Sequence, residues 1–318
     1  MTRHSPTDFS IQALRLSFVA LRLLSPDLAR LGAERLFSTP RRRKETEAEQ
    51  SAMRNGRNFH IVSNGLRLRG HVWGEGPAVL CLHGWEGQGS QFHAFIEPLA
   101  QAGFSTITFD QPGHGGSQGR RSGPLDWAQA TRDLVTTMGP IHGLIAHSLG
   151  AAGAAVAMDH GLHVPCAVFL APPARPDPYY SGVLTLLGFP ESEHPAAFNA
   201  YARRAGLPPE RIRLLSLAPR LSVPMLVIHD RADREVPWSD GEAIALAWPS
   251  AILLTTEGLG HRRILRDACV IQQAIGFIRQ VPSSGTLPFH GDGPRSLEWH
   301  LFHRELRTND DRPQPKCA

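Results

Sequence analysis

The sequence predicts an α/β fold, in which a mostly parallel eight-stranded sheet is flanked by helices and carries a small helical cap. The first observation is a series of short apolar runs of strand length that alternate with segments of helical periodicity. The second is an interruption of about fifty proline-rich residues between two successive strands. The third is that glycine-rich turns follow several strands directly. Together these features predict one large core with an insertion.

Residues 1–57 are expected to form an N-terminal helical extension followed by a charged linker. Apolar side chains recur at helical spacing from position 11 to 37, and Ser25-Pro26 divides the pattern into two short helices. Docking of these helices on the core is the first interpretation. Peripheral contact with a membrane surface through residues 9–37 and a dimer contact are the alternatives.

Basic charge is concentrated in the same region. The formal net charge is +4, and residues 1–57 hold eleven Arg or Lys against six Asp or Glu. The run from Arg41 to Lys44 is followed at once by three glutamates that neutralise it, which predicts a solvated linker over residues 38–55. A nucleic-acid binder needs its positive charge organised on one face, so nucleic acid is not an expected partner.

The predicted core consists of residues 58–171 and 221–282. Its first two strands flank Ser63-Asn64-Gly65, which is a hairpin signal. Strands are expected at 59–62, 66–73, 78–82, 105–109, 143–146, 166–170, 225–228 and 252–255. Helix-like segments at 90–102, 125–138, 149–160, 239–247 and 264–280 separate most of them, as in a parallel sheet covered on both faces.

Two regions depart from this alternation. Residues 172–220, between two core strands, are rich in proline and contain helix-like stretches, so they are predicted to form the helical cap. Residues 283–318 are rich in proline, glycine and charge without a sustained period, which predicts a mostly disordered tail.

Composition indicates a globular protein of the cytoplasm. Hydrophobic residues make up 42% and charged residues 19%, unlike a disordered chain. The four cysteines form no CxxC pair, and Cys81 and Cys166 lie in apolar runs, which favours free thiols in a reducing compartment. Arg15 and Arg22 interrupt the most apolar N-terminal stretch, so neither a transmembrane segment nor a signal peptide is expected.

The strongest chemical signal follows the strand expected at 143–146. Ala146-His147-Ser148-Leu149-Gly150 leads into a helix that begins with small residues. A tight strand-to-helix turn projects a hydroxyl outward, and the N-terminus of the helix favours negative charge there. Ser148 is therefore the candidate nucleophile, although Ala146 replaces the first glycine of the G-x-S-x-G pattern.

Two glycine-rich turns follow other strands. His83-Gly84-Trp85-Glu86-Gly87-Gln88-Gly89 comes after the strand at 78–82. A phosphate-binding loop is the alternative interpretation, but no Gly-Lys-Ser/Thr is present and Glu86 lies within the turn. The other turn, Asp110-Gln111-Pro112-Gly113-His114-Gly115-Gly116-Ser117, follows the strand at 105–109.

A candidate base and its acid come later in the chain. His261 follows the last predicted strand after a glycine-containing loop, so its imidazole is a candidate to take the hydroxyl proton of Ser148. Asp233 follows the strand at 225–228, and Asp230 and Glu235 are competing acids nearby. The chain order is Ser, Asp, His.

In this order, the motifs resemble those of the α/β-hydrolase superfamily, in its serine hydrolase and esterase branch with a cap insertion. The resemblance covers roughly residues 58–280 without the cap. It implies that Asp233 orients His261, because positions 229–237 match H-x-x-x-D-x-x-V-P. It also implies oxyanion-binding backbone N–H groups at Trp85 and Leu149, and structural roles for Asp110 and His114.

This resemblance implies acyl chemistry on a small-molecule substrate through an acyl-enzyme. A carboxylesterase is the first expectation, and a thioesterase, lipase, lysophospholipase, C–C bond hydrolase or peptidase stays open. An acyltransferase or perhydrolase and a noncatalytic binding protein are further alternatives. No cofactor or metal is expected, because the histidines lack a recurrent ligand spacing. The oligomeric state is left open.

Apolar side chains of the predicted cap offer surface for a medium-sized apolar ester, and packing of the cap on the core is the equal alternative. They are Tyr179, Tyr180, Leu184, Leu186, Leu187, Phe189 and Phe198. Arg262-Arg263 is expected to be structural or at the surface, with pairing to a substrate carboxylate as the alternative.

Overall fold

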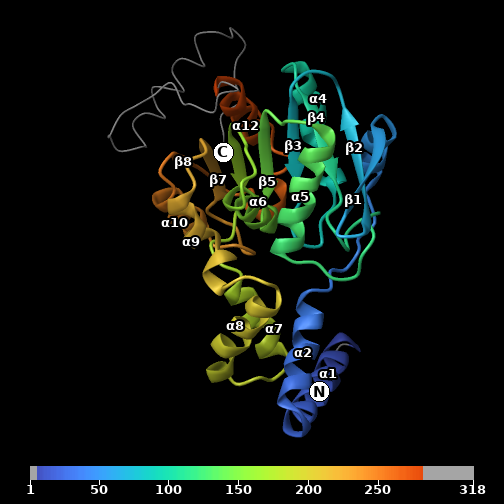
Figure 1. The fold of residues 1–318 in the computed structure, drawn as a ribbon, viewed down its shortest axis with the longest axis vertical. Coiled ribbons are helices and arrows are strands. Elements are labelled where there is room, and N and C mark those ends of the chain that lie inside the picture. The colour runs from blue at the N-terminus through green and yellow to red at the C-terminus, as the bar shows by residue number, and fades with distance from the viewer. Residues whose placement is uncertain (1–5, 282–318) are drawn as a thin grey trace.

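A computed structural model of the protein describes residues 6–281 and contains one eight-stranded sheet of order β1-β2-β4-β3-β5-β6-β7-β8 (Figure 1). The strands are β1 (Arg57–Ser63), β2 (Leu66–Trp73), β3 (Ala78–Leu82), β4 (Ser105–Phe109), β5 (Gly143–His147), β6 (Ala167–Leu170), β7 (Met225–Asp230) and β8 (Ala251–Thr256). Strand β2 pairs antiparallel with β1 and β4, whereas the other neighbours are parallel. The mostly parallel eight-stranded sheet predicted from the sequence is confirmed.

The hairpin between β1 and β2 forms at the predicted turn. Asn64 and Gly65 both have positive φ, at 48° and 75°, and the flanking residues Ser63 and Leu66 face each other. Asparagine and glycine tolerate this conformation, whose twist matches that of the two strands.

Helices cover both faces of the sheet. On β3, Leu80 and Leu82 pack on one face, with α5 (Pro124–Met138), α6 (Leu149–Asp159) and α10 (Trp238–Ala247). Val79 and Cys81 face the other side, where α4 (His93–Gln101) and α12 (Ala268–Gln280) pack. The central strands are therefore apolar on both sides, which explains their continuous apolar sequences.

The segment between β6 and β7 contains the helices α7 (Asp177–Leu186), α8 (His194–Arg204) and α9 (Leu214–Leu217). In Figure 1, α7 and α8 extend away from the sheet, below the end that carries α9. The N-terminal helices α1 (Pro6–Leu24) and α2 (Pro26–Phe37) lie beside them.

The N-terminal helices pack on this insertion and not on the sheet. Ala29 and Ala33 of α2 are fully buried in an apolar group that we call the cap cluster. Its other buried members come from residues 180–212, and they are Tyr180, Leu184, Leu187, Phe189, Ala197, Phe198, Tyr201, Ala202 and Ile212. The ion pair from Arg22 to Glu193, 2.9 Å long, joins the same two regions. Docking on the core, the first interpretation of the sequence, is therefore corrected to docking on the cap.

The charged linker contains a further helix, α3 (Glu47–Arg54), which the sequence interpretation did not include. A capping box begins it: the Glu49 N–H donates to Thr46 Oγ1, and the Thr46 N–H donates to a Glu49 carboxylate oxygen over 2.8 Å. The signal was the spacing of threonine and glutamate at 46 and 49.

The described residues bear on three other expectations. Cys81 and Cys166 are buried free thiols, but Cys269 is disulfide-bonded, so free thiols are not the rule throughout the chain. Within residues 6–281, no helix combines the length and apolar character needed to cross a bilayer. The tail predicted at 283–318 lies outside the described residues.

Candidate active site

Ser148 occupies a strained turn between β5 and α6. Its φ is +52°, which is rare for a residue with a side chain, and its N–H donates to Leu170 O over 2.9 Å. A Cβ at Gly150 would lie 2.6 Å from His83 O, so only glycine fits there. Ala146, by contrast, is an interior residue of β5 that is fully buried, and its methyl group is accommodated.

The turn after β3 lies against this serine. A Cβ at Gly84 would stand 2.8 Å from the Cβ of Ser148, so glycine permits the close approach. Trp85 and Leu149 line the same pocket as Ser148. Among residues 6–281, no acceptor is found for the backbone N–H of Trp85 or Leu149. Both groups can therefore bind an anionic oxygen near Ser148.

His83 joins this turn to the loop after β4. Its Nδ1–H donates to Gly84 O over 2.7 Å, and its Nε2 accepts from the Gln111 N–H over 2.9 Å. Burial lowers the pKa of His83 to about 4, so the ring is neutral and can donate and accept at the same time. This histidine positions the turn that carries Trp85.

Asp110 and His114 have the structural contacts that the sequence predicted. One carboxylate oxygen of Asp110 accepts from the Gly89 N–H and the other from the Gly116 N–H, each over 2.8 Å. His114 donates to Pro112 O, and burial lowers its pKa to about 3. These bonds close the loop and leave neither side chain in contact with Ser148.

The structure brings His261 and Asp233 together from the loops that follow the adjacent parallel strands β8 and β7. The Nδ1–H of His261, in the short helix α11 (Gly260–Arg263), donates to Asp233 Oδ2 over 2.8 Å. The other oxygen, Oδ1, accepts the N–H groups of Glu235 and Val236 over 2.8 and 2.9 Å. Burial by itself opposes ionisation, but hydrogen bonds from two histidines and the Val236 N–H hold the pKa of Asp233 well below its usual range.

Asp230 does not contact the imidazole. It accepts the N–H groups of Ala232 and Leu259 and the hydroxyl of Thr256, over 2.9, 2.9 and 2.8 Å. Burial opposes its ionisation, but these bonds hold its pKa below the usual value. Asp230 thus attaches the end of β7 to the loop that leads to His261, so the geometry favours Asp233 as the orienting acid.

A pocket of about 370 Å³ lies at the candidate nucleophile and base. Ser148 and His261 line it, but no hydrogen bond joins the Ser148 hydroxyl to His261 in the described structure. Hydrogen bonds of this kind are often long before substrate binds. Two ion pairs also border the pocket, Arg41 with Glu86 at 3.3 Å and Arg262 with Glu235 at 2.8 Å.

Comparison with known proteins relates this architecture to a family. A family model described as "Serine aminopeptidase, S33" matches residues 76–196, a span that includes Trp85 and Ser148. The chain belongs to the α/β-hydrolase superfamily. The match supports the superfamily that the sequence predicted.

A curated relative and several solved structures are similar to this α/β-hydrolase. A serine hydrolase-like protein of Danio rerio is 36% identical over 90 residues, a match that covers 26% of this chain and about a quarter, 27%, of that relative. A thermophilic esterase of Thermogutta terrifontis is 22% identical, with a TM-score of 0.56, and the match covers 71% of this chain and 99% of the other. An esterase of Pyrococcus furiosus is 16% identical, with a TM-score of 0.58, and the match covers 76% of this chain and 99% of the other. These structures share the fold.

His147 is a site residue that sequence reasoning missed. Its Nε2–H donates to the backbone oxygen of His261 over 2.9 Å, and the two rings lie 4.7 Å apart. Burial lowers the pKa of His147 to about 3, so it is a neutral donor that fixes the backbone of the candidate base. No sequence signal distinguished this histidine, because the elbow pattern accepts any residue there.

The cap supplies less of the pocket than the sequence suggested. Of the seven apolar residues named for it, only Tyr179 lines the pocket in the described structure. Leu186 is exposed, and the other five are buried in the cap cluster. Those five pack within the cap and against α2, so the alternative that they pack the cap on the core is corrected as well. The end of α2 and the segment after it also line the pocket, with Phe37, Arg41, Arg42 and Arg43, which no motif indicated.

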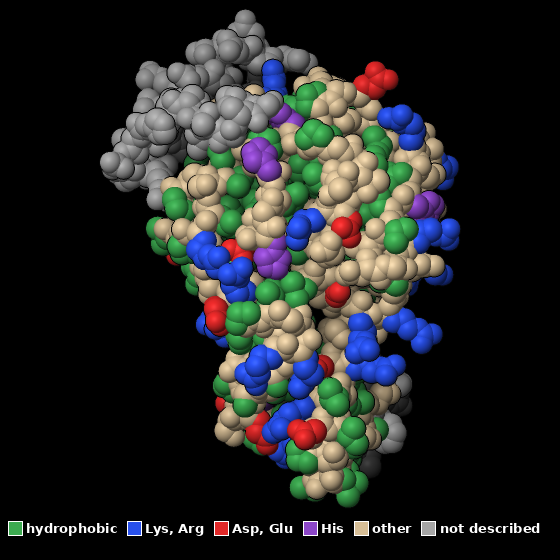
Figure 2. Space-filling model, in the orientation of Figure 1, with side chains coloured by type: hydrophobic (Ala, Val, Ile, Leu, Met, Phe, Trp, Pro, Cys, Tyr) green, Lys and Arg blue, Asp and Glu red, His purple; other side chains and the backbone are tan. Residues whose placement is uncertain are grey.

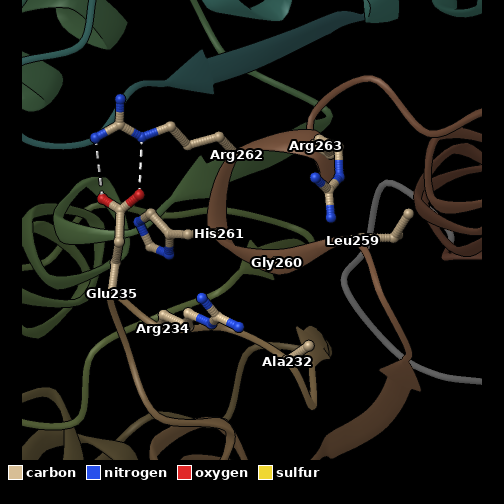
Figure 3. Close-up of a pocket in the computed structure, with 8 residues that line it drawn as sticks. All are labelled: Ala232, Arg234, Glu235, Leu259, Gly260, His261, Arg262 and Arg263. Atoms are coloured by element: carbon tan, nitrogen blue, oxygen red, sulfur yellow. Dashed lines mark hydrogen bonds and ion pairs between the residues drawn. The ribbon is translucent and has the colours of Figure 1, made fainter.

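A second hollow, of about 450 Å³, borders the loop of His261 (Figure 3). There Arg262 forms two hydrogen bonds with the Glu235 carboxylate, over 2.8 and 3.1 Å. Arg263 donates to Gly258 O. Since Arg262 already has a carboxylate partner, the structural interpretation of this pair is favoured over binding of a substrate carboxylate. In residues 6–281, no three His, Cys, Asp or Glu side chains are grouped as metal ligands would be.

Proposed function

We propose that this α/β-hydrolase is a carboxylesterase in which Ser148 is the nucleophile, His261 the general base and Asp233 the acid that orients it. The observation that carries the proposal is the 2.8 Å hydrogen bond from His261 Nδ1 to Asp233 Oδ2. That bond leaves Nε2 of the imidazole unprotonated, in a pocket that Ser148 also lines.

In the first half of the reaction, Ser148 Oγ attacks the ester carbonyl carbon and its proton passes to Nε2 of His261. The carbonyl oxygen becomes an oxyanion that the N–H groups of Trp85 and Leu149 bind, each worth about 3–4 kcal/mol. The carbon–oxygen bond to the alcohol then breaks, and the leaving alcohol takes the proton from His261. Ser148 retains the acyl group.

In the second half, water replaces the alcohol. It gives a proton to His261 as its oxygen attacks the acyl carbon, and the proton then returns to Ser148 Oγ as the carboxylic acid leaves. Asp233 stays ionised throughout, in line with its lowered pKa. The carboxylate stabilises the imidazolium each time it forms.

The pocket favours an uncharged, medium-sized apolar ester. Its walls include Phe37, Trp85, Tyr179 and Tyr201. Four arginines line it. Arg41, Arg43 and Arg262 are paired with glutamates, and Arg42 donates to three backbone oxygens of the core, so each guanidinium already has acceptors other than a substrate carboxylate. Apolar walls stabilise an acyl or alkyl chain by about 0.8 kcal/mol for each buried methylene.

An aminopeptidase is the second candidate, because the matching family model carries that description. Such an enzyme needs an acidic group for the substrate ammonium. Glu86 and Glu235 border the pocket, but each already has an arginine partner. This pairing favours the ester.

The test combines a covalent probe with a panel of substrates. A fluorophosphonate should label the protein, and Ser148→Ala should abolish both labelling and hydrolysis of a short p-nitrophenyl ester. Ser239→Ala, on the exposed surface of α10, is the matched control and should change neither. Persistent labelling of Ser148→Ala would exclude this nucleophile. Faster turnover of an aminoacyl p-nitroanilide or a thioester than of every ester would exclude the carboxylesterase.

A further inference from the structure

The pocket contains an aromatic ring from the N-terminal extension. Phe37, the last residue of α2, stacks on Trp85 with ring centroids 6.4 Å apart and an angle of 17°. It also meets Tyr201 of α8 edge-on, with centroids 5.5 Å apart. All three rings line the pocket of Ser148. An extension that precedes the core by twenty residues thus supplies part of the wall of the site.

The two ends of the pocket differ in exposure. The side chains of Arg41 and Arg262 are 91% and 74% exposed, so the two ion pairs mark the side that is open to solvent. Tyr201 and Ile212, by contrast, are 8% and 2% exposed. Phe37 is half-buried and meets Tyr201 of this wall edge-on, so its ring lies beside the closed end.

The segment after Phe37 is attached to the core. The guanidinium of Arg42 donates to the backbone oxygens of Gly115 and Ser117, each over 2.6 Å, and to that of Gly119 over 3.2 Å. Ser38 O accepts the Ser122 N–H over 2.8 Å. Arg41, Arg42 and Lys44 are exposed, as expected for a solvated linker, but the segment is also attached to the core, which the sequence did not predict.

The other side of the ring is held by the cap cluster. Tyr180 meets Phe37 edge-on, with centroids 5.0 Å apart, and is itself fully buried. The ring is thus packed between Tyr180, Tyr201 and Trp85, on a backbone that Arg42 ties to the core. Displacing it would require rearrangement of the cap as well as of the segment.

We infer that Phe37 determines substrate specificity: its ring closes the apolar end of the pocket and sets the upper length of the acyl or alkyl group that the site accepts. The inference rests on the proposed esterase function. A group longer than the space would have to move a packed ring, which costs binding free energy. An acyl or alkyl group shorter than the space leaves part of the apolar wall of the pocket without contact.

The test is a series of straight-chain p-nitrophenyl esters with Phe37→Ala. The ratio of kcat/KM for long over short chains should rise, by about fourfold for each methylene that gains burial. Two newly buried methylenes should therefore give more than tenfold. Phe18→Ala is the matched control, because Phe18 packs in the cap cluster, 6.5 Å from Phe189, without lining the pocket. The ratio of kcat/KM for long over short chains in Phe18→Ala should equal that of the unaltered protein.

An equal loss of kcat/KM for all chain lengths in Phe37→Ala would overturn the inference, since the ring would then only stabilise the fold. If Phe37→Ala does not fold, Phe37→Leu should shift the ratio in the same direction by a smaller factor, and an unchanged ratio there would also overturn it. Labelling rates with short- and long-chain alkyl fluorophosphonates give the same ratio without ester turnover. Ser148 labelling without ester hydrolysis would therefore refute the proposed function alone.

Discussion

The substitution Asp233→Asn tests whether Asp233, and not the nearby Asp230, is the acid that orients His261. The N–H groups of Glu235 and Val236 donate to Oδ1 of Asp233, so the amide oxygen of Asp233→Asn should remain there. The new NH₂ group then faces Nδ1 of His261, where two donors would meet. The imidazole avoids this by moving its proton to Nε2, which leaves no base for Ser148.

The expected loss in kcat is about 10⁴-fold, the loss typical of this change in a Ser-His-Asp triad. It corresponds to about 5.4 kcal/mol, since each tenfold step is 1.36 kcal/mol. The change of stability should be small by comparison, because the backbone bonds to Oδ1 are retained.

Asp230→Asn is the matched control, with the same chemical change three residues away. It weakens charge-assisted bonds to Ala232, Leu259 and Thr256, so we expect a loss of unfolding free energy of about 2 kcal/mol. Turnover should fall by about tenfold or less, through a shift of the loop that leads to His261.

The assay is steady-state hydrolysis of a p-nitrophenyl ester, with urea unfolding of each variant in parallel. If the two substitutions reduced kcat equally, or Asp230→Asn reduced it more, the assignment of Asp233 would be refuted. A kcat profile of Asp233→Asn that recovers at high pH would support it, since hydroxide can then replace the missing base.

Two other predictions concern stability. Gly150→Ala should destabilise the protein by about 1–3 kcal/mol, because its Cβ would meet a backbone oxygen at 2.6 Å. Gly182→Ala, inside α7 with open space around it, should stabilise the protein by about 0.4–1 kcal/mol. Similar midpoints of urea unfolding for the two variants would contradict this prediction. Burial lowers the pKa values of His83, His114 and His147 to about 4, 3 and 3, so the unfolded chain binds more protons below its own histidine pKa of about 6.5. The contribution of these histidines to the free energy of unfolding should be fully present above about pH 7. It should fall as the pH drops from 6.5 towards 4, by on the order of 1–2 kcal/mol per histidine at pH 5. Equal midpoints of thermal unfolding at pH 7.5 and pH 5 would show that these rings are not buried and neutral.

Local signals were sufficient for the sheet. Each strand near the expected site is a short apolar run that ends in glycine or a polar turn, and this pattern depends only on neighbours in the sequence. The order of Ser148, Asp233 and His261 gave the candidate triad, and the structure brings the acid and base into contact. Their catalytic roles stay predictions until the variants are measured.

Long-range contacts were the part that the sequence did not predict. The periodicity of α1 and α2 shows that they have an apolar face, but it contains no information on whether a sheet or a cap covers that face. Phe37 was similarly assigned to a helix end, and only its contacts with Trp85 and Tyr201 relate it to the pocket. The helix α3 was not predicted although its capping box is present, because its eight residues are too few for a sustained helical period.

The cap cluster also affects the order of events during synthesis of the chain. Its buried members in α2 and in the insertion are separated by about 150 residues, from Ala33 to Tyr180, and a ribosome adds about 5–20 residues per second. The helices α1 and α2 therefore leave the ribosome about 10–30 s before the aromatic residues that bury Ala29 and Ala33 exist. During that interval Ala29 and Ala33 lack the cap residues that bury them, so α1 and α2 cannot complete their packing until α8 emerges.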